Sequence, residues 1–161
     1  MKIKFFAVGG TIDKVYFDAL SRYEIGESNI SDILKDARVN FRYDIASLLK
    51  KDSLDMTDKD RSIIHKAVAR TPYEKIIITH GTDTMIETAK VLSSLTNKVV
   101  VLTGAMEPAK FKSSDAIFNL GSAVAAVQTL PHGVYLAISG RIFTPNNVRK
   151  NRALKQFEEK M

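Results

Sequence analysis

Four short runs of apolar residues recur along the chain, and each run ends at small or hydroxyl-bearing residues. The runs cover residues 3–8, 76–78, 99–102 and 134–138. Continuous apolar runs of this length, rich in valine and isoleucine, are typical of strands that are buried on both faces. Residues 39–45 alternate apolar and polar side chains instead, which predicts a half-buried or edge strand.

Helical patterns lie between these runs. Thr57 is the expected N-cap of a helix that stops before Pro72, and residues 85–95 and 114–130 predict two more helices. In the last helix we interpret Gly121 and its neighbouring alanines as a surface for tight helix-to-sheet packing. The alternation of strands and helices predicts an α/β fold, in which a mostly parallel sheet carries helices on both faces.

Residues 10–28 show no clear periodicity, and we expect a long loop that is functional or mobile. The whole chain, residues 1–161, has the length of one compact domain. No apolar run approaches the roughly 18 residues of a membrane helix, and the N-terminus lacks a signal-peptide pattern. We therefore expect a cytoplasmic protein without membrane partners.

Composition removes several kinds of site. The chain has no cysteine, which excludes disulfides, cysteine nucleophiles and cysteine-ligated metals. Its three histidines are far apart without ligand spacing, so no metal and no cofactor are expected. The net charge is +6, and the basic run 149–155 could be a phosphate-binding patch or a solvated helix face. We favour the helix face, and so expect no nucleic-acid partner.

We expect the candidate site residues where the apolar runs end, because ligands of open α/β sheets bind beyond the carboxyl ends of the strands. Thr11, Thr82 and Thr103 stand at three such ends, and Asp83 follows Thr82 where a strand turns into a helix. A threonine hydroxyl is a weak nucleophile and needs a base or an electropositive partner. Taken alone, the glycines before Thr11 fit an ordinary strand-ending turn better than a catalytic site.

Several segments in order along the chain match one family. The chain resembles the N-terminal domain of the bacterial-type L-asparaginases, a three-layer domain of Rossmann/flavodoxin-like kind. The matching segments are Gly-Gly-Thr-Ile at 9–12, Tyr-Glu-Ile-Gly at 23–26, Asp-Ser-Leu-Asp-Met at 52–56, Thr-His-Gly-Thr-Asp-Thr at 79–84, Thr-Gly-Ala-Met at 103–106, Ser-Asp at 114–115 with Asn119, and Gly-Arg at 140–141 leading to Val-Arg-Lys at 148–150.

The resemblance implies that Thr11 is the nucleophile that attacks a side-chain amide. It implies that Tyr23 lies on a mobile loop that closes on the substrate and hydrogen-bonds the Thr11 hydroxyl. Thr82, Asp83 and Lys150 would form a second catalytic group. A lysine can accept a proton from a hydroxyl or from water if its pKa is lowered.

The same resemblance implies the substrate contacts. Ser53 would bind the α-carboxylate and Asp83 the α-ammonium, and Gly10 and Ala105 would also lie at the substrate. His80 is interpreted as a buried structural histidine. Leu54 departs from the family pattern, since relatives often carry a polar residue there that contacts the substrate.

Length is the largest departure, because the family's enzymes carry a second, C-terminal domain, which we expect this chain to lack. The expected function is hydrolysis of L-asparagine, or of a related small amide, to acid and ammonia through an acyl-enzyme, in a homo-oligomer. Two alternatives stay open. One is a non-catalytic module that binds a small ligand, and the other is an ammonia-releasing component of a tRNA-dependent amidotransferase.

Overall fold

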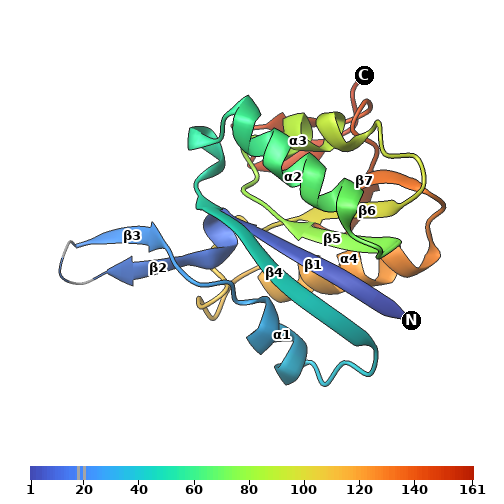
Figure 1. The fold of residues 1–161 in the computed structure, drawn as a ribbon. Coiled ribbons are helices and arrows are strands. Elements are labelled where there is room, and N and C mark those ends of the chain that lie inside the picture. The colour runs from blue at the N-terminus through green and yellow to red at the C-terminus, as the bar shows by residue number, and fades with distance from the viewer. Residues whose placement is uncertain (18, 20) are drawn as a thin grey trace.

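A computed structural model describes residues 1–17, 19 and 21–161, and it is built on a six-stranded sheet (Figure 1). The strand order is β4-β1-β5-β6-β7-β8, and all neighbours are parallel except β7 and β8. The strands are β1 (Lys2–Gly9), β4 (Arg42–Lys51), β5 (Lys75–Thr79), β6 (Val99–Thr103), β7 (Gly133–Ile138) and β8 (Arg141–Phe143). The predicted mostly parallel sheet is confirmed.

Helices cover both faces of this sheet. They are α1 (Ile30–Asp36), α2 (Asp58–Arg70), α3 (Met85–Leu92) and α4 (Ala116–Thr129). Figure 1 shows α2 and α3 on one face of the sheet and α1 and α4 on the other. Ile64 of α2 and Leu92 of α3 belong to one apolar cluster, and Leu34 of α1 and Leu120 of α4 belong to a second. The predicted three-layer α/β class is therefore confirmed. In the described part of the chain, no helix is long and apolar enough to cross a membrane.

Local sequence signals set the limits of these elements with mixed accuracy. Thr57 caps α2, because its hydroxyl accepts from Asp60 N at 3.2 Å while the Asp60 carboxylate accepts from Thr57 N at 2.9 Å. Helix α3 ends at Leu92, three residues earlier than the pattern predicts. The edge strand predicted at 39–45 lies at 42–51 instead, because its parallel pairing with β1 continues to the pair of Gly9 and Lys51.

The segment 10–28 is not a featureless loop. It holds a 3-10 turn (Thr11–Asp13) and a hairpin of β2 (Lys14–Phe17) and β3 (Arg22–Ile25) that projects from the body (Figure 1). Tyr16 and Tyr23 face each other across the hairpin with ring centroids 5.4 Å apart. Strands of four residues are too short for their alternation to be visible in the sequence, and cross-strand aromatic packing stabilises them instead.

Asp13 fastens this hairpin to the body. Its side chain is buried and accepts from Asn29 N at 3.0 Å, just before α1, while its backbone oxygen accepts from Gly26 N at 2.8 Å. Burial penalises the charged carboxylate more than these hydrogen bonds stabilise it, and raises the pKa of Asp13 to about 6. The hairpin base thus contains a carboxyl group that titrates near neutrality.

The C-terminal basic run is also a hairpin, not the predicted helix. β9 (Arg149–Asn151) pairs with β10 (Gln156–Glu158), and residues 152–155 form the turn between them. Phe157 is buried in the core, whereas Leu154 is exposed at the turn. The helical interpretation was wrong because a charged segment with only two spaced apolar residues fits the period of a helix and that of a strand equally well.

Two glycines show how differently the same residue is used. Gly10 has a φ of +88°, and a Cβ there would lie 2.4 Å from Gly81 N. Gly121 is exposed on α4, and a Cβ there would have no neighbour within 4 Å. The predicted tight packing at Gly121 is therefore wrong, and the buried residues of the helix, such as Ala123, make the sheet contact instead.

Replacing each of these glycines with alanine should have opposite effects. Gly10→Ala forces a positive φ and a backbone clash, and should lower the free energy of unfolding by about 2 kcal/mol or more. Gly121→Ala favours the helix and should raise it by roughly 0.5–1 kcal/mol. Urea denaturation of both variants measures this, and a stable Gly10→Ala protein would contradict the contact between Gly10 and Gly81.

Asp13→Asn should change how stability depends on pH. The pKa of Asp13 is raised on folding, so ionisation destabilises the folded chain progressively from about pH 4 to pH 6. Asparagine keeps the acceptor for Asn29 N but does not ionise. Relative to wild type, the variant should gain roughly 3 kcal/mol between pH 4 and pH 7, measured by urea denaturation at several pH values. A pH-independent difference would exclude titration of Asp13.

Candidate active site

Backbone contact between two strand ends builds the site. β1 ends at Gly9 and β5 at Thr79, and these neighbouring parallel strands lead into the same edge of the sheet. Beyond them, Gly10 lies directly against Gly81, so close that no Cβ fits between the two backbones. The next residue on each side is a threonine, and this contact brings Thr11 and Thr82 to one cavity.

That cavity has a volume of about 270 Å³, and four of the residues that line it are candidates from the sequence analysis. Thr11 and Thr82 come from the ends of β1 and β5, and Lys150 comes from β9. The Nζ atom of Lys150 donates to Thr82 Oγ1 and to Asp83 Oδ1, each at 2.8 Å. The structure thus joins Thr11, Thr82, Asp83 and Lys150 around one space, although Lys150 lies 67 residues beyond Asp83.

The lysine contact is electrostatically favourable and shielded from water. The Lys150 side chain is 12% exposed and that of Asp83 is 33% exposed. A charge-assisted hydrogen bond in such a setting is stronger than one between neutral groups, and it fixes the ammonium beside the Thr82 hydroxyl. Thr82 is therefore a hydroxyl with an electropositive partner, as nucleophile chemistry requires.

His80 supports the site from beneath without facing the cavity. Its ring is completely buried, and Nδ1 lies 2.8 Å from Gly81 O while Nε2 lies 2.8 Å from Thr88 Oγ1. A carbonyl only accepts, so Nδ1 carries the proton and Nε2 accepts from the threonine hydroxyl. Burial lowers the pKa of His80 to about 4, so the ring is neutral near pH 7. This is a structural histidine.

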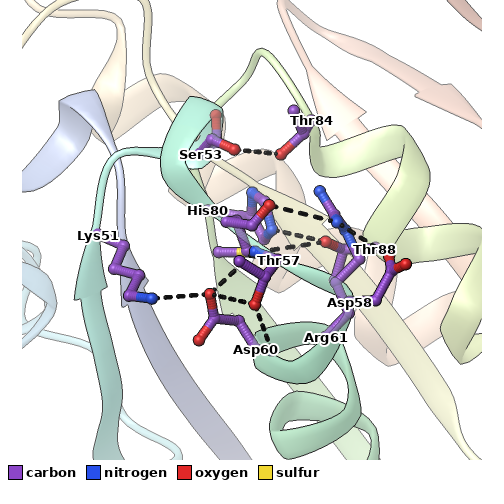
Figure 2. A network of polar contacts seen from close by, with 10 residues as sticks. Lys51, Ser53, Thr57, Asp58, Asp60, Arg61, His80, Thr84 and Thr88 are labelled. Carbon is purple, nitrogen blue, oxygen red and sulfur yellow. Dashed lines mark hydrogen bonds and ion pairs between the residues drawn. The ribbon is translucent and has the colours of Figure 1, made fainter.

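Polar contacts connect the end of β4 and the segment after it to α2 and to Thr84, which follows Asp83 (Figure 2). Thr84 Oγ1 donates to Ser53 O at 2.8 Å, and Lys51 Nζ pairs with Asp60 at 2.8 Å. The Ser53 side chain itself is buried against Gly81, where an added Cβ would lie 2.5 Å from its hydroxyl. Ser53 is thus beside the rim but does not line the cavity of Thr11 and Lys150.

Tyr23 lies on strand β3, not on the loop that the sequence suggested. It lines a neighbouring cavity of about 220 Å³, which Thr11 also lines. Its ring packs against Tyr16 and against Phe111 at a centroid distance of 5.8 Å. Thr11 therefore lines two neighbouring cavities, one shared with Tyr23 and the other shared with Lys150.

The segment that contains Ala105 is held rigidly. Ala105 is buried, and the Asp115 carboxylate accepts from Met106 N at 3.0 Å and from Glu107 N at 3.1 Å. The Asn119 side chain donates to Gly104 O at 2.9 Å and accepts from Ser139 N at 2.9 Å. These bonds fix the ends of β6 and β7 beside the cavity.

Sequence reasoning missed three residues that line the cavity, namely Met106, Arg152 and Lys155. The sequence pattern places Arg152 and Lys155 on a solvated helix face, and only their spacing of two and five residues from Lys150 indicates a place near the site. Three cations and one carboxylate give the lining a formal charge of +2. Within residues 1–17, 19 and 21–161, no group of three or more histidine and acidic side chains could hold a metal ion.

Comparison with known proteins agrees with this geometry. An L-asparaginase of Thermococcus kodakarensis is 32% identical over 166 residues, which cover 96% of this chain and 49% of that protein. The solved structure of a thermostable L-asparaginase from Thermococcus kodakarensis superposes with a TM-score of 0.86 at 29% identity, covering 99% of this chain and 51% of that one. A probable cytoplasmic L-asparaginase of Campylobacter jejuni gives a TM-score of 0.85 at 31% identity, covering 98% and 53%.

A shorter similarity points to a related group. One component of the glutamyl-tRNA(Gln) amidotransferase of Methanococcus vannielii is 45% identical over 71 residues, which cover 43% of this chain and 17% of that protein. The chain spans about half the length of the L-asparaginases it matches. Residues 2–158, nearly the whole chain, match the family described as the N-terminal part of asparaginase. The protein belongs to the asparaginase family and corresponds to the N-terminal domain of its members.

Proposed function

We propose that this domain hydrolyses the side-chain amide of L-asparagine, or of a related small amide, to the acid and ammonia. One observation carries the proposal: Lys150 Nζ contacts both Thr82 Oγ1 and Asp83 Oδ1 at 2.8 Å in the cavity that Thr11 lines. A domain that only bound a ligand would need neither two rim threonines nor a lysine fixed on one of them. The similarity to L-asparaginases supports the same reaction.

In the proposed mechanism Thr11 is the nucleophile. Its hydroxyl oxygen bonds to the amide carbon, its proton passes through the pair of Thr82 and Lys150 to the amide nitrogen, and ammonia leaves. Water then attacks the ester, one of its protons returns to the Thr11 oxygen, and the acid departs. Asp83 keeps Lys150 aligned on Thr82, and the hydrogen bonds around Lys150 stabilise charge that develops nearby.

The remaining assignments form part of the same proposal. Tyr23 closes over Thr11 as the hairpin moves, Ser53 and Asp83 contact the carboxylate and ammonium of the amino acid, and the backbone at Gly10 and Ala105 borders the substrate. A homo-oligomer in the cytoplasm is the expected setting, and the similarity to a probable cytoplasmic enzyme supports that location. No metal or cofactor takes part in the proposed reaction.

A second candidate is release of ammonia for a tRNA-dependent amidotransferase, which the similarity to the Methanococcus vannielii protein supports. That function would use the same amide chemistry with a different acceptor for the ammonia. The matched stretch covers less than half of the chain, whereas the L-asparaginase match covers 96%. Hydrolysis of a free amide is therefore the function we favour.

Thr11→Ala should lower ammonia release from a panel of small amides by roughly a thousandfold or more, because the attacking oxygen is gone. Thr82→Ala should lower it strongly as well, since Lys150 loses the hydroxyl it contacts. Thr129→Ala, on the exposed side of α4, is the matched control and should retain full turnover. A Thr11→Ala protein with wild-type turnover would disprove the assigned nucleophile.

The β2–β3 hairpin should close when the site is occupied. It projects from the body (Figure 1) and contacts it through the Tyr23–Phe111 pair and the Lys14–Asp52 ion pair, whereas β5 is buried inside the sheet. Its amides should therefore exchange faster than those of β5 without ligand. Addition of L-aspartate should slow exchange at residues 14–17 and 22–25, as measured by hydrogen–deuterium exchange. Exchange as slow as in β5, and unchanged by aspartate, would argue against a lid.

A further inference from the structure

The turn between β9 and β10 brings two cations to the rim of the candidate active site. Arg152 and Lys155 line the same cavity as Thr11 and Lys150, and both side chains are exposed. The hairpin beneath them is anchored, because Phe157 is buried in the core and Arg149 pairs with Glu158 at 2.8 Å. The position of the turn is therefore set by the core and not by a ligand.

These two cations differ from the other basic residues around the rim. Lys14 pairs with Asp52 at 3.1 Å, and Lys51 pairs with Asp60 at 2.8 Å. Neither Arg152 nor Lys155 forms an ion pair with a carboxylate of the described residues. The one carboxylate of the cavity, Asp83, is already bonded to Lys150. Arg152 and Lys155 thus present positive charge at the cavity with which no carboxylate of the described residues pairs.

Free L-asparagine matches this charge poorly. It carries an α-ammonium as well as an α-carboxylate, and each must exchange water for protein partners on binding. Among the described residues that line the cavity, the ammonium finds Asp83 as its one anionic partner, and Asp83 is already ion-paired with Lys150. An amide that carries a carboxylate without the ammonium avoids this mismatch, because the two unpaired cations attract its carboxylate and have no ammonium to repel.

We infer that the site selects small amides of net negative charge, the monoamides of dicarboxylic acids, with Arg152 and Lys155 binding the free carboxylate. Succinamate, which is asparagine without its α-ammonium, is the simplest such compound. The inference rests on the proposed amide hydrolysis and adds the class of substrate. It makes Arg152 and Lys155 specificity-determining residues of the site.

The test compares succinamate with L-asparagine on the full chain, with ammonia release as the readout. Wild type should prefer succinamate in kcat/KM by about tenfold or more, the range expected for loss or gain of one charge-assisted contact. Arg152→Gln combined with Lys155→Asn should lower kcat/KM for succinamate by at least about tenfold, mainly through KM. It should lower that for asparagine by a smaller factor, because the lost attraction for the α-carboxylate is offset by the lost repulsion of the α-ammonium. Asparagine suits position 155, where φ is +51°.

Two controls keep the result specific. Lys66→Gln removes one exposed charge from α2, away from the cavity, and should leave both substrates unaffected. Arg152→Lys, made as a single variant, should retain part of the succinamate preference, because it keeps the charge. Equal losses for both amides in the double variant, or a wild-type preference for asparagine, would overturn the inference.

Calorimetry separates this inference from the proposed hydrolysis. Wild type should bind succinate more tightly than L-aspartate, and the double variant should lose most of that difference. If succinate binds in this way but no amide releases ammonia, the hydrolysis proposal fails and the charge selection stands. If succinate binds no better than L-aspartate, the charge selection is wrong whatever the turnover.

Discussion

The contact between Gly10 and Gly81 is the constraint on which the candidate site depends. The two backbones approach so closely that an added Cβ on Gly10 would lie 2.4 Å from Gly81 N. Gly81 itself packs against the side chain of Ser53. Any side chain between them would push β1 and β5 apart at their carboxyl ends. Thr11 would then no longer share the cavity in which Lys150 contacts Thr82.

The sheet and the two threonines could be predicted from the sequence because their signals are local. A buried parallel strand needs a continuous apolar run, and the turn that follows it needs glycine or a small polar residue. Both signals are present around Thr11 and Thr82. The capping box at Thr57 is equally local, since its hydrogen bonds join residues three positions apart.

The β2–β3 and β9–β10 hairpins could not be predicted, because specific pairs of residues seven and nine positions apart define them, and not a periodic pattern. Strands β2 and β3 are held together by Tyr16 against Tyr23, and β9 and β10 by Arg149 against Glu158. Each strand is too short for a period of two to be distinguished from chance. The same limit concealed Arg152 and Lys155, whose place beside the site depends on where a hairpin turn lies in space.

The buried groups Asp13 and His80 have a joint consequence for folding. The pKa of Asp13 rises to about 6 on burial, and that of His80 falls to about 4. At a pH of about 5 the unfolded chain therefore carries its proton on the imidazole, and the folded chain carries it on the carboxyl group. Folding moves a proton from one side chain to the other and exchanges almost none with the solvent. Their contributions to the pH dependence of the free energy of unfolding have opposite signs and cancel. The contribution of either group therefore becomes measurable only in a variant that lacks the other.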